Sequence, residues 1–120
     1  MIEQLSGFPD SILAFVCHGQ VTKADYENVI IPAAEKAAKE YGKIRLYYEI
    51  GQEFSGIEPG AMWDDFKVGM GHLSQWERIA IVTDVDWIKL AVQALRLLLP
   101  GKLRIFPTEE AAAARAWIVT

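Results

Sequence analysis

Two runs of consecutive apolar residues limit the folds that this chain can adopt. They occupy residues 12–17, with the sequence Ile-Leu-Ala-Phe-Val-Cys, and residues 79–82, with the sequence Ile-Ala-Ile-Val. A strand with one face in water alternates apolar and polar residues, whereas a strand covered on both faces is apolar throughout. The two runs therefore predict buried strands in a sheet of the α/β class.

Turn signals divide the rest of the chain into strand-like and helix-like segments. A strict alternation predicts a strand over residues 44–50. The other expected strands are 2–5, 12–17, 78–83 and 102–106, and the expected helices are 22–41, 61–73, 87–99 and 108–117. A turn at residues 8–11 would make the first two strands an antiparallel hairpin, and residues 51–60 are expected to form a loop.

This order of segments predicts one domain over residues 1–120. Strands that are joined through a helix are usually parallel. We therefore expect a mixed β-sheet that opens with an N-terminal antiparallel hairpin, keeps its first strand at an edge and continues in β-α units.

The helix predicted over residues 22–41 carries a start signal and an internal conflict. Thr22 and Asp25 have the spacing of a capping box, and Gly42 is suited to end the helix. Pro32 lies in the interior, where proline removes a hydrogen bond and clashes with the preceding turn. We expect a kink there, or two abutting helices of which the second begins at Pro32.

The helix predicted over residues 87–99 has more apolar surface than a sheet needs to cover. At 3.6 residues per turn its ten apolar residues span an arc of roughly 220°, and a helix on a sheet typically needs about 100° or somewhat more. Lys89, Gln93 and Arg96 share one narrow polar stripe. Three explanations stay open: a neighbouring helix of the same domain, a partner in a homodimer, or a site for a non-polar ligand or membrane surface. Simple exposure to water is the least expected outcome.

A ligand site on this face would combine residues from two helices. Trp63, Phe66 and Met70 fall on one stripe of the helix predicted over 61–73. Flexible methionine beside tryptophan suits an adaptable apolar site, although it suits a core equally well. The candidate ligand-binding residues are Trp63, Phe66, Met70, Val92, Leu95 and Leu99.

The chain lacks the residue patterns of common catalytic and metal sites. Cys17 is the single cysteine, in a strand that should be buried, and His18 and His72 are the two histidines. No metal-binding, nucleotide-binding or nucleophile motif is present. We therefore expect no catalytic residue, no metal and no cofactor.

The net charge and the length of the apolar runs indicate which partners and which cellular compartment to expect. The net charge of −4, without a cluster of basic residues along the sequence, disfavours a nucleic-acid partner. The first residues do not resemble a signal peptide, and no apolar run reaches the ~20 residues of a membrane span. A single cysteine fits a reducing compartment, so we expect a cytoplasmic protein.

An ordered set of short segments resembles the SpoIIAA-like proteins of the STAS superfamily, specifically a small branch of uncharacterised bacterial proteins. The resemblance covers nearly the whole chain. Its carriers are residues 19–26 leading to Pro32, Trp63-Asp64-Asp65, residues 78–84 followed by Trp87, Arg104-Ile105-Phe106, and the alanine-rich helix ending at Trp117. The resemblance implies a mixed sheet with helices mainly on one face and a non-enzymatic role.

The resemblance also implies two kinds of function. STAS domains act as regulatory interaction modules, and the best-known ones are switched by phosphorylation of a serine in an Asp-Ser-Ser-Gly type segment. In that pattern the segment follows the third strand, at the start of the second helix. Here the corresponding region retains one hydroxyl, Ser55, without the preceding Asp or the second Ser, and Ser55 is the candidate regulatory phosphosite. Members of this branch look like carriers or sensors of non-polar ligands, with a loose likeness to CRAL-TRIO lipid-binding domains.

The leading hypothesis is a domain that binds a non-polar small molecule or membrane lipid. The alternative is a protein-interaction regulator of the anti-sigma-factor-antagonist type that acts through a dimer or partner surface.

Overall fold

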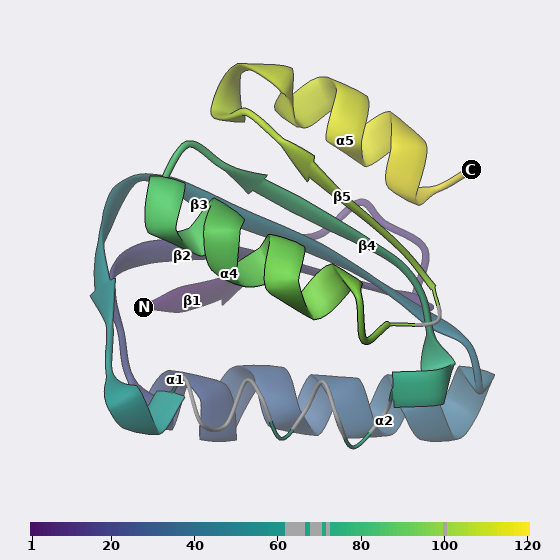
Figure 1. The fold of residues 1–120 in the computed structure, drawn as a ribbon. Helices are drawn as coiled ribbons and strands as arrows, with labels where there is room; N and C mark the ends of the chain where they lie inside the picture. Colours follow the sequence, from purple (N-terminus) through teal and green to yellow (C-terminus); the bar gives the residue numbers. More distant parts are fainter. Residues whose placement is uncertain (62–66, 68–70, 72, 100) are drawn as a thin grey trace.

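A computed structural model shows one five-stranded β-sheet whose strands lie in the order of the sequence, from β1 to β5 (Figure 1). The description below covers residues 1–61, 67, 71, 73–99 and 101–120, without the side chains of Gln52, Glu53, Leu73 and Leu95. The strands are β1 (Ile2–Gln4), β2 (Ile12–Val21), β3 (Ile44–Ile57), β4 (Trp76–Thr83) and β5 (Lys102–Phe106). The helices are α1 (Lys23–Asp25), α2 (Ile31–Tyr41), α4 (Asp86–Arg96) and α5 (Ala111–Ile118), with short 3₁₀ turns at Leu73–Gln75 and Thr108–Glu110.

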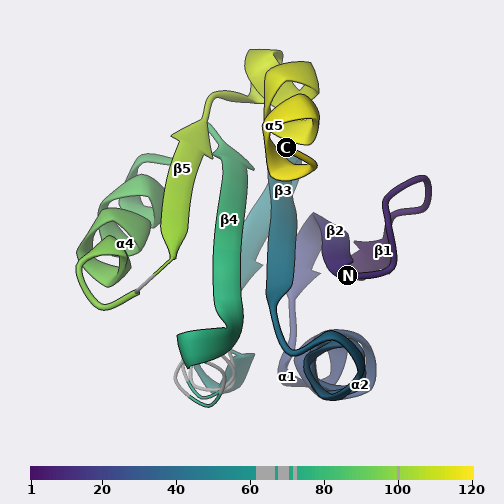
Figure 2. The same cartoon turned by 90° about the vertical axis from the view of Figure 1, so that its right-hand side faces the viewer.

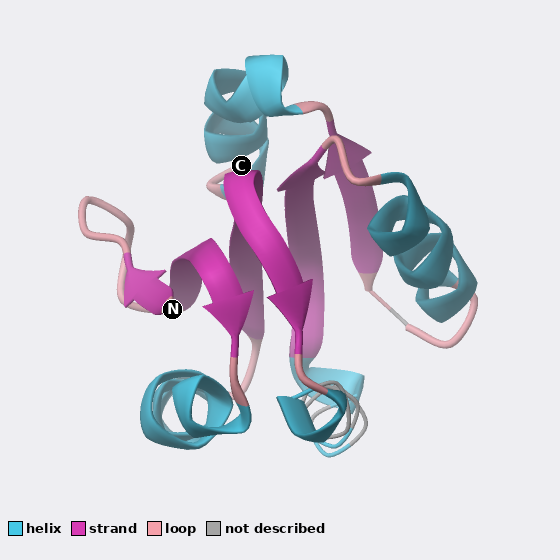
Figure 3. Cartoon of the chain, turned by 90° about the vertical axis from the view of Figure 1, so that its left-hand side faces the viewer, coloured by secondary structure: helices cyan, strands magenta, loops and turns pink. Residues whose placement is uncertain are grey.

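The pairing of the strands confirms the predicted mixed sheet. β1 lies antiparallel to β2 at one edge, with Ile2 opposite Cys17, and the loop between these strands projects from the sheet (Figure 3). The pairs β2–β3, β3–β4 and β4–β5 are all parallel. The opening hairpin and the helix-linked parallel strands are thus arranged as the order of segments predicts.

The predicted loop at residues 51–60 is wrong, because β3 continues to Ile57. The glycines and Pro59 of this stretch resemble turn residues. β2, however, extends to Val21 and offers backbone partners to the second half of β3, after irregularities in register around Gly19. A partner strand therefore overrides the local turn signal. The next helical residues are Pro59, Gly60 and Ala61.

The conflict at Pro32 is resolved by a change of helix type. Thr22 and Asp25 form the predicted capping box: the Asp25 amide donates to Thr22 Oγ1 over 3.1 Å, and the Thr22 amide donates to Asp25 Oδ2 over 2.8 Å. A five-residue π-helix, Tyr26–Ile30, then joins α1 to α2, which carries Pro32 in its first turn. A first-turn proline is tolerated because the amide hydrogens there have no partner within the helix.

Helices cover both faces of the sheet. α2 and α4 pack on one face with a core that includes Phe15, Tyr48 and Ile81, and α5 packs on the other with Tyr47 and Val82. In Figure 1 the sheet accordingly lies between α5 above and α2 below. The resemblance implied helices mainly on one face, and α5 is the helix on the opposite side.

Gly101 allows the start of β5 to lie against β4. A Cβ atom at this position would overlap the carbonyl oxygen of Trp76 and lie 2.8 Å from the carbonyl oxygen of Glu77. Because both obstacles are backbone atoms, they cannot rotate away. The close approach sets the position of Lys102 beside Arg78 in the sheet.

We expect Gly101→Ala to lower the free energy of unfolding by about 1–3 kcal/mol, the usual cost of overpacking. Gly51→Ala is the matched control, because a Cβ there meets nothing within 4 Å. Urea denaturation of both variants and the parent protein checks this. Equal stability of the two variants would contradict the close approach.

Candidate functional site

An apolar surface lies exposed along α4 and the turn after it. We call it the α4 surface and define it by Trp87, Leu90, Ala91, Ala94, Leu97 and Leu98. The large side chains are exposed by 48% for Trp87, 68% for Leu90, 88% for Leu97 and 55% for Leu98. Large apolar patches open to water are uncommon on monomers and mark places of interaction.

The α4 surface arises because the helix carries two apolar faces. At 3.6 residues per turn, Trp87, Leu90, Ala91 and Ala94 fall within an arc of roughly 100°. The opposite face, with Ile88 and Val92, packs into the core of the sheet. Figure 2 shows α4 lying beside β5, at the edge of the sheet. The helix thus meets the domain with one face and presents the second to water, the outcome least expected from the sequence.

Polar and aromatic groups border the α4 surface. The Lys89 ammonium lies 3.9 Å from the Asp86 carboxylate, and Gln93 and Arg96 are exposed on the same stripe. The Trp87 ring lies 6.4 Å from the ring of Phe54 in β3, centroid to centroid. The border therefore carries the ion pair of Lys89 with the exposed Asp86, one further cation at Arg96, and one aromatic contact at the first turn of α4.

The candidate ligand-binding residues fall in different environments. Val92 and Leu99 are partly buried and pack against the core. Trp63, Phe66 and Met70 lie outside the described residues, as does the side chain of Leu95 within α4. That these residues together form a ligand-binding site stays a prediction. The strongly exposed Leu90 and Leu97 belong to the apolar arc of the predicted helix, and its periodicity alone does not distinguish them from the residues that face the core.

Ser55 lies on the surface, in a setting that differs from the one expected. Its side chain is exposed, and it belongs to the last part of β3. A serine at the start of a helix would face free amide hydrogens, whereas one within a strand does not. The position is accessible, and its modification stays a prediction.

A polar cluster centred on the buried Tyr47 lies on the α5 face of the sheet, with Glu49 partly exposed and Arg115 exposed. The Tyr47 hydroxyl donates to Glu49 Oε1 over 2.7 Å, and Arg115 Nε donates to the Tyr47 oxygen over 3.4 Å. Burial, and then the hydrogen bond to Glu49, raise the pKa of Tyr47 to about 12. Because the phenol holds its proton so firmly at neutral pH, it can donate a hydrogen bond but cannot act as a base.

We expect the stability of the protein to fall between pH 10 and 12 partly because of Tyr47. An unfolded tyrosine ionises near pH 10, so the unfolded state gains stability over this range while the folded state still holds the proton. The difference in free energy of unfolding between the parent protein and Tyr47→Phe should change by roughly 2 kcal/mol from pH 9.5 to 12. Chemical denaturation at several pH values measures this difference. If the free energy of unfolding depended on pH in the same way in the two proteins, the raised pKa of Tyr47 would be refuted.

Two features bear on metals and membranes. Among the residues described, no three His, Cys, Asp or Glu side chains form a group that could hold a metal ion. Within the same ranges, the helices are too short or too polar to cross a bilayer.

The fold and the similarity to known proteins define the class of protein to which the chain belongs. The sheet order, the antiparallel edge hairpin and the helices on both faces define a STAS-type α/β domain. The SpoIIAA-like family model matches residues 12–119, and the chain belongs to that family. A similar solved structure is an uncharacterised protein with a SpoIIAA-like fold from Shewanella loihica PV-4, with a TM-score of 0.74 and 28% identity, covering 98% of this chain and 93% of that one. No curated protein matches the chain.

Proposed function

We propose that this STAS-like domain is not an enzyme and that it binds lipid or another non-polar ligand through the α4 surface, as a carrier or sensor. The observation that supports the proposal is the exposure of Leu90 and Leu97 on a helix that already buries Ile88 in the core. Moving a leucine side chain from water into an apolar layer is favourable by about 1.5–3 kcal/mol. Several such side chains on one face give a driving force for association.

The borders of the α4 surface favour a lipid layer over an enclosed pocket. Helices that lie in a membrane interface combine an apolar face with a cationic polar face. Lys89 and Arg96 lie on the polar stripe beside the apolar one. Asp86 offsets the charge of Lys89, so Arg96 supplies most of the attraction to anionic headgroups, at about 1 kcal/mol. The helix can therefore lie flat on a lipid surface, with its axis parallel to the layer.

We expect Leu97→Glu to lower binding to vesicles of phosphatidylcholine and phosphatidylglycerol by at least about tenfold, since a buried leucine contributes about 1.5–3 kcal/mol. Leu97 is 88% exposed, so the substitution leaves the core intact. Leu90→Glu should act in the same way. The measurement is co-sedimentation with the vesicles.

Gln93→Glu is the matched control, because it adds the same charge on the exposed polar stripe of α4. Vesicle binding that survives in Leu97→Glu and Leu90→Glu at the level of the control would overturn the proposal. A protein that ignores vesicles but forms a dimer, and that becomes a monomer in light scattering when Leu97 is replaced, would assign the α4 surface to the regulatory alternative.

A further inference from the structure

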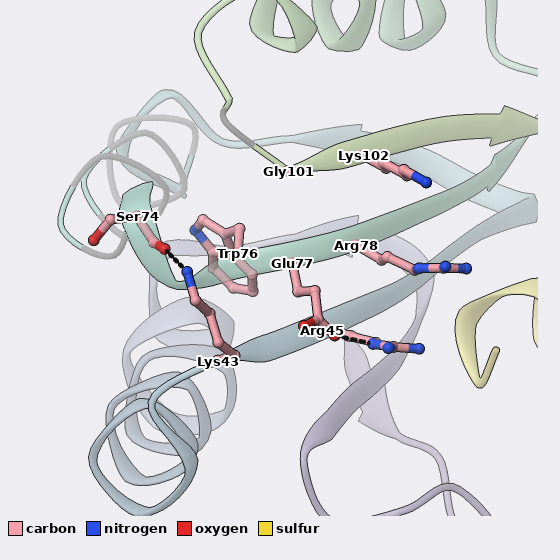
Figure 4. A pocket seen from close by; sticks show the side chains of 8 residues that line it. All are labelled: Lys43, Arg45, Ser74, Trp76, Glu77, Arg78, Gly101 and Lys102. Atoms are coloured by element: carbon pink, nitrogen blue, oxygen red, sulfur yellow. Dashed lines mark hydrogen bonds and ion pairs between the residues drawn. The ribbon is translucent and has the colours of Figure 1, made fainter.

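An open cleft lies where the parallel strands β3, β4 and β5 begin (Figure 4). Its volume is about 450 Å³, and its lining comes from the starts of these strands and the residues just before them. The charged side chains of the lining are Lys43, Arg45, Glu77, Arg78 and Lys102. Four cations against one carboxylate make this a basic cleft in a chain whose net charge is −4.

Three of these cations form a row across the sheet. The register places Arg45 of β3 opposite Arg78 of β4, and Arg78 opposite Lys102 of β5. In Figure 4 the three side chains extend from neighbouring strands in the same direction, toward α5. Neighbouring strands are about 4.8 Å apart, and like charges directly opposite one another are destabilising. Such a row costs stability unless an anion offsets it.

Contacts within the protein offset part of the positive charge of this row. Arg45 Nε lies 2.7 Å from Glu77 Oε1, and Arg45 Nη1 donates to the carbonyl oxygen of Ile118 over 2.7 Å. Arg78 Nη1 donates to the carbonyl oxygen of Trp117 over 3.1 Å and to Thr120 Oγ1 over 2.6 Å. Cations at the C-terminal end of a helix are favourable, so α5 explains the positions of both arginines.

The C-terminal end of α5 does not explain the position of the Lys102 side chain. This side chain is exposed, and within the described ranges it has no hydrogen bond or ion pair. Its position is nevertheless fixed at the backbone, because Gly101 lies directly against the carbonyl groups of Trp76 and Glu77. A guanidinium has five N–H donors, so Arg45 and Arg78 also retain donors beyond those that α5 and Glu77 occupy.

We propose that this cleft binds a phosphate group, carried by a small phosphate ester or by a lipid headgroup. Arginine recognises phosphate through paired N–H donors, and lysine adds a compact charge. The row offers the remaining donors of two guanidinium groups and one lysine ammonium, on a rigid sheet. The site is separate from the α4 surface and does not depend on the function proposed for it.

Calorimetric titration with glycerol 3-phosphate tests the cleft directly. Lys102→Gln should weaken binding about tenfold, the loss expected for one charge-assisted contact. Lys36→Gln is the matched control, since Lys36 is an exposed lysine of α2 outside the cleft. Leu97→Glu should bind glycerol 3-phosphate as the parent protein does, whether or not the α4 surface binds lipid.

A second arm separates the two sources of phosphate, using vesicles of phosphatidylcholine with phosphatidic acid. Binding of glycerol 3-phosphate that depends on Lys102 identifies a site for soluble esters. Vesicle binding that depends on Lys102, without binding of glycerol 3-phosphate, identifies a headgroup site. If the Lys102 and Lys36 variants behave alike in both arms, the cleft is not a phosphate site and the proposal fails.

Discussion

The structure depends on the burial of β3 and β4 on both faces of the sheet. Tyr47 and Val82 are fully buried on the α5 side, and Ile44 is fully buried on the other. Two covered faces require a helix on each side. On one side the short helix α5 suffices because alanines such as Ala114 let its backbone approach closely. The remaining helices must therefore share the opposite face.

That division of space explains the unusual exposure of α4. The helix lies at the β5 edge of the sheet and buries Ile88 and Val92 on the face that α2 also covers. Nothing among the described elements covers its second apolar face. A sequence selected only for stability would place polar residues where Leu90 and Leu97 stand. The core of the described elements therefore does not require this apolar face, and the proposed binding role rests on that difference.

Local patterns allowed much of the fold to be predicted, and contacts between distant residues account for the rest. The apolar runs, the capping box at Thr22 and the two apolar faces of α4 are each encoded within one segment, although α4 ends at Arg96 and not at the predicted residue 99. The length of β3 does not follow from local patterns, because Phe54 and Ile57 pair with Gly19 and Val21 of β2, about 35 residues earlier and far outside any local window. The periodicity of α4 also gives no sign of which apolar residues face the sheet. For this reason the sequence predicts Val92 and Leu99 as ligand contacts, whereas the structure packs both against the core.

The basic cleft was invisible in the sequence for the same reason, since Arg45, Arg78 and Lys102 meet only through strand register. It also differs in physical character from the α4 surface, although the two are separated by a few residues along the chain. Attraction between exposed charges is screened over about 8 Å at physiological ionic strength, whereas apolar association is strengthened by salts such as sulfate. Added salt should therefore weaken binding at the cleft, which rests on charge, more than binding at the α4 surface, where the charge contribution is screened but the apolar contribution is not. The two proposed sites can therefore be distinguished by their response to salt as well as by substitution.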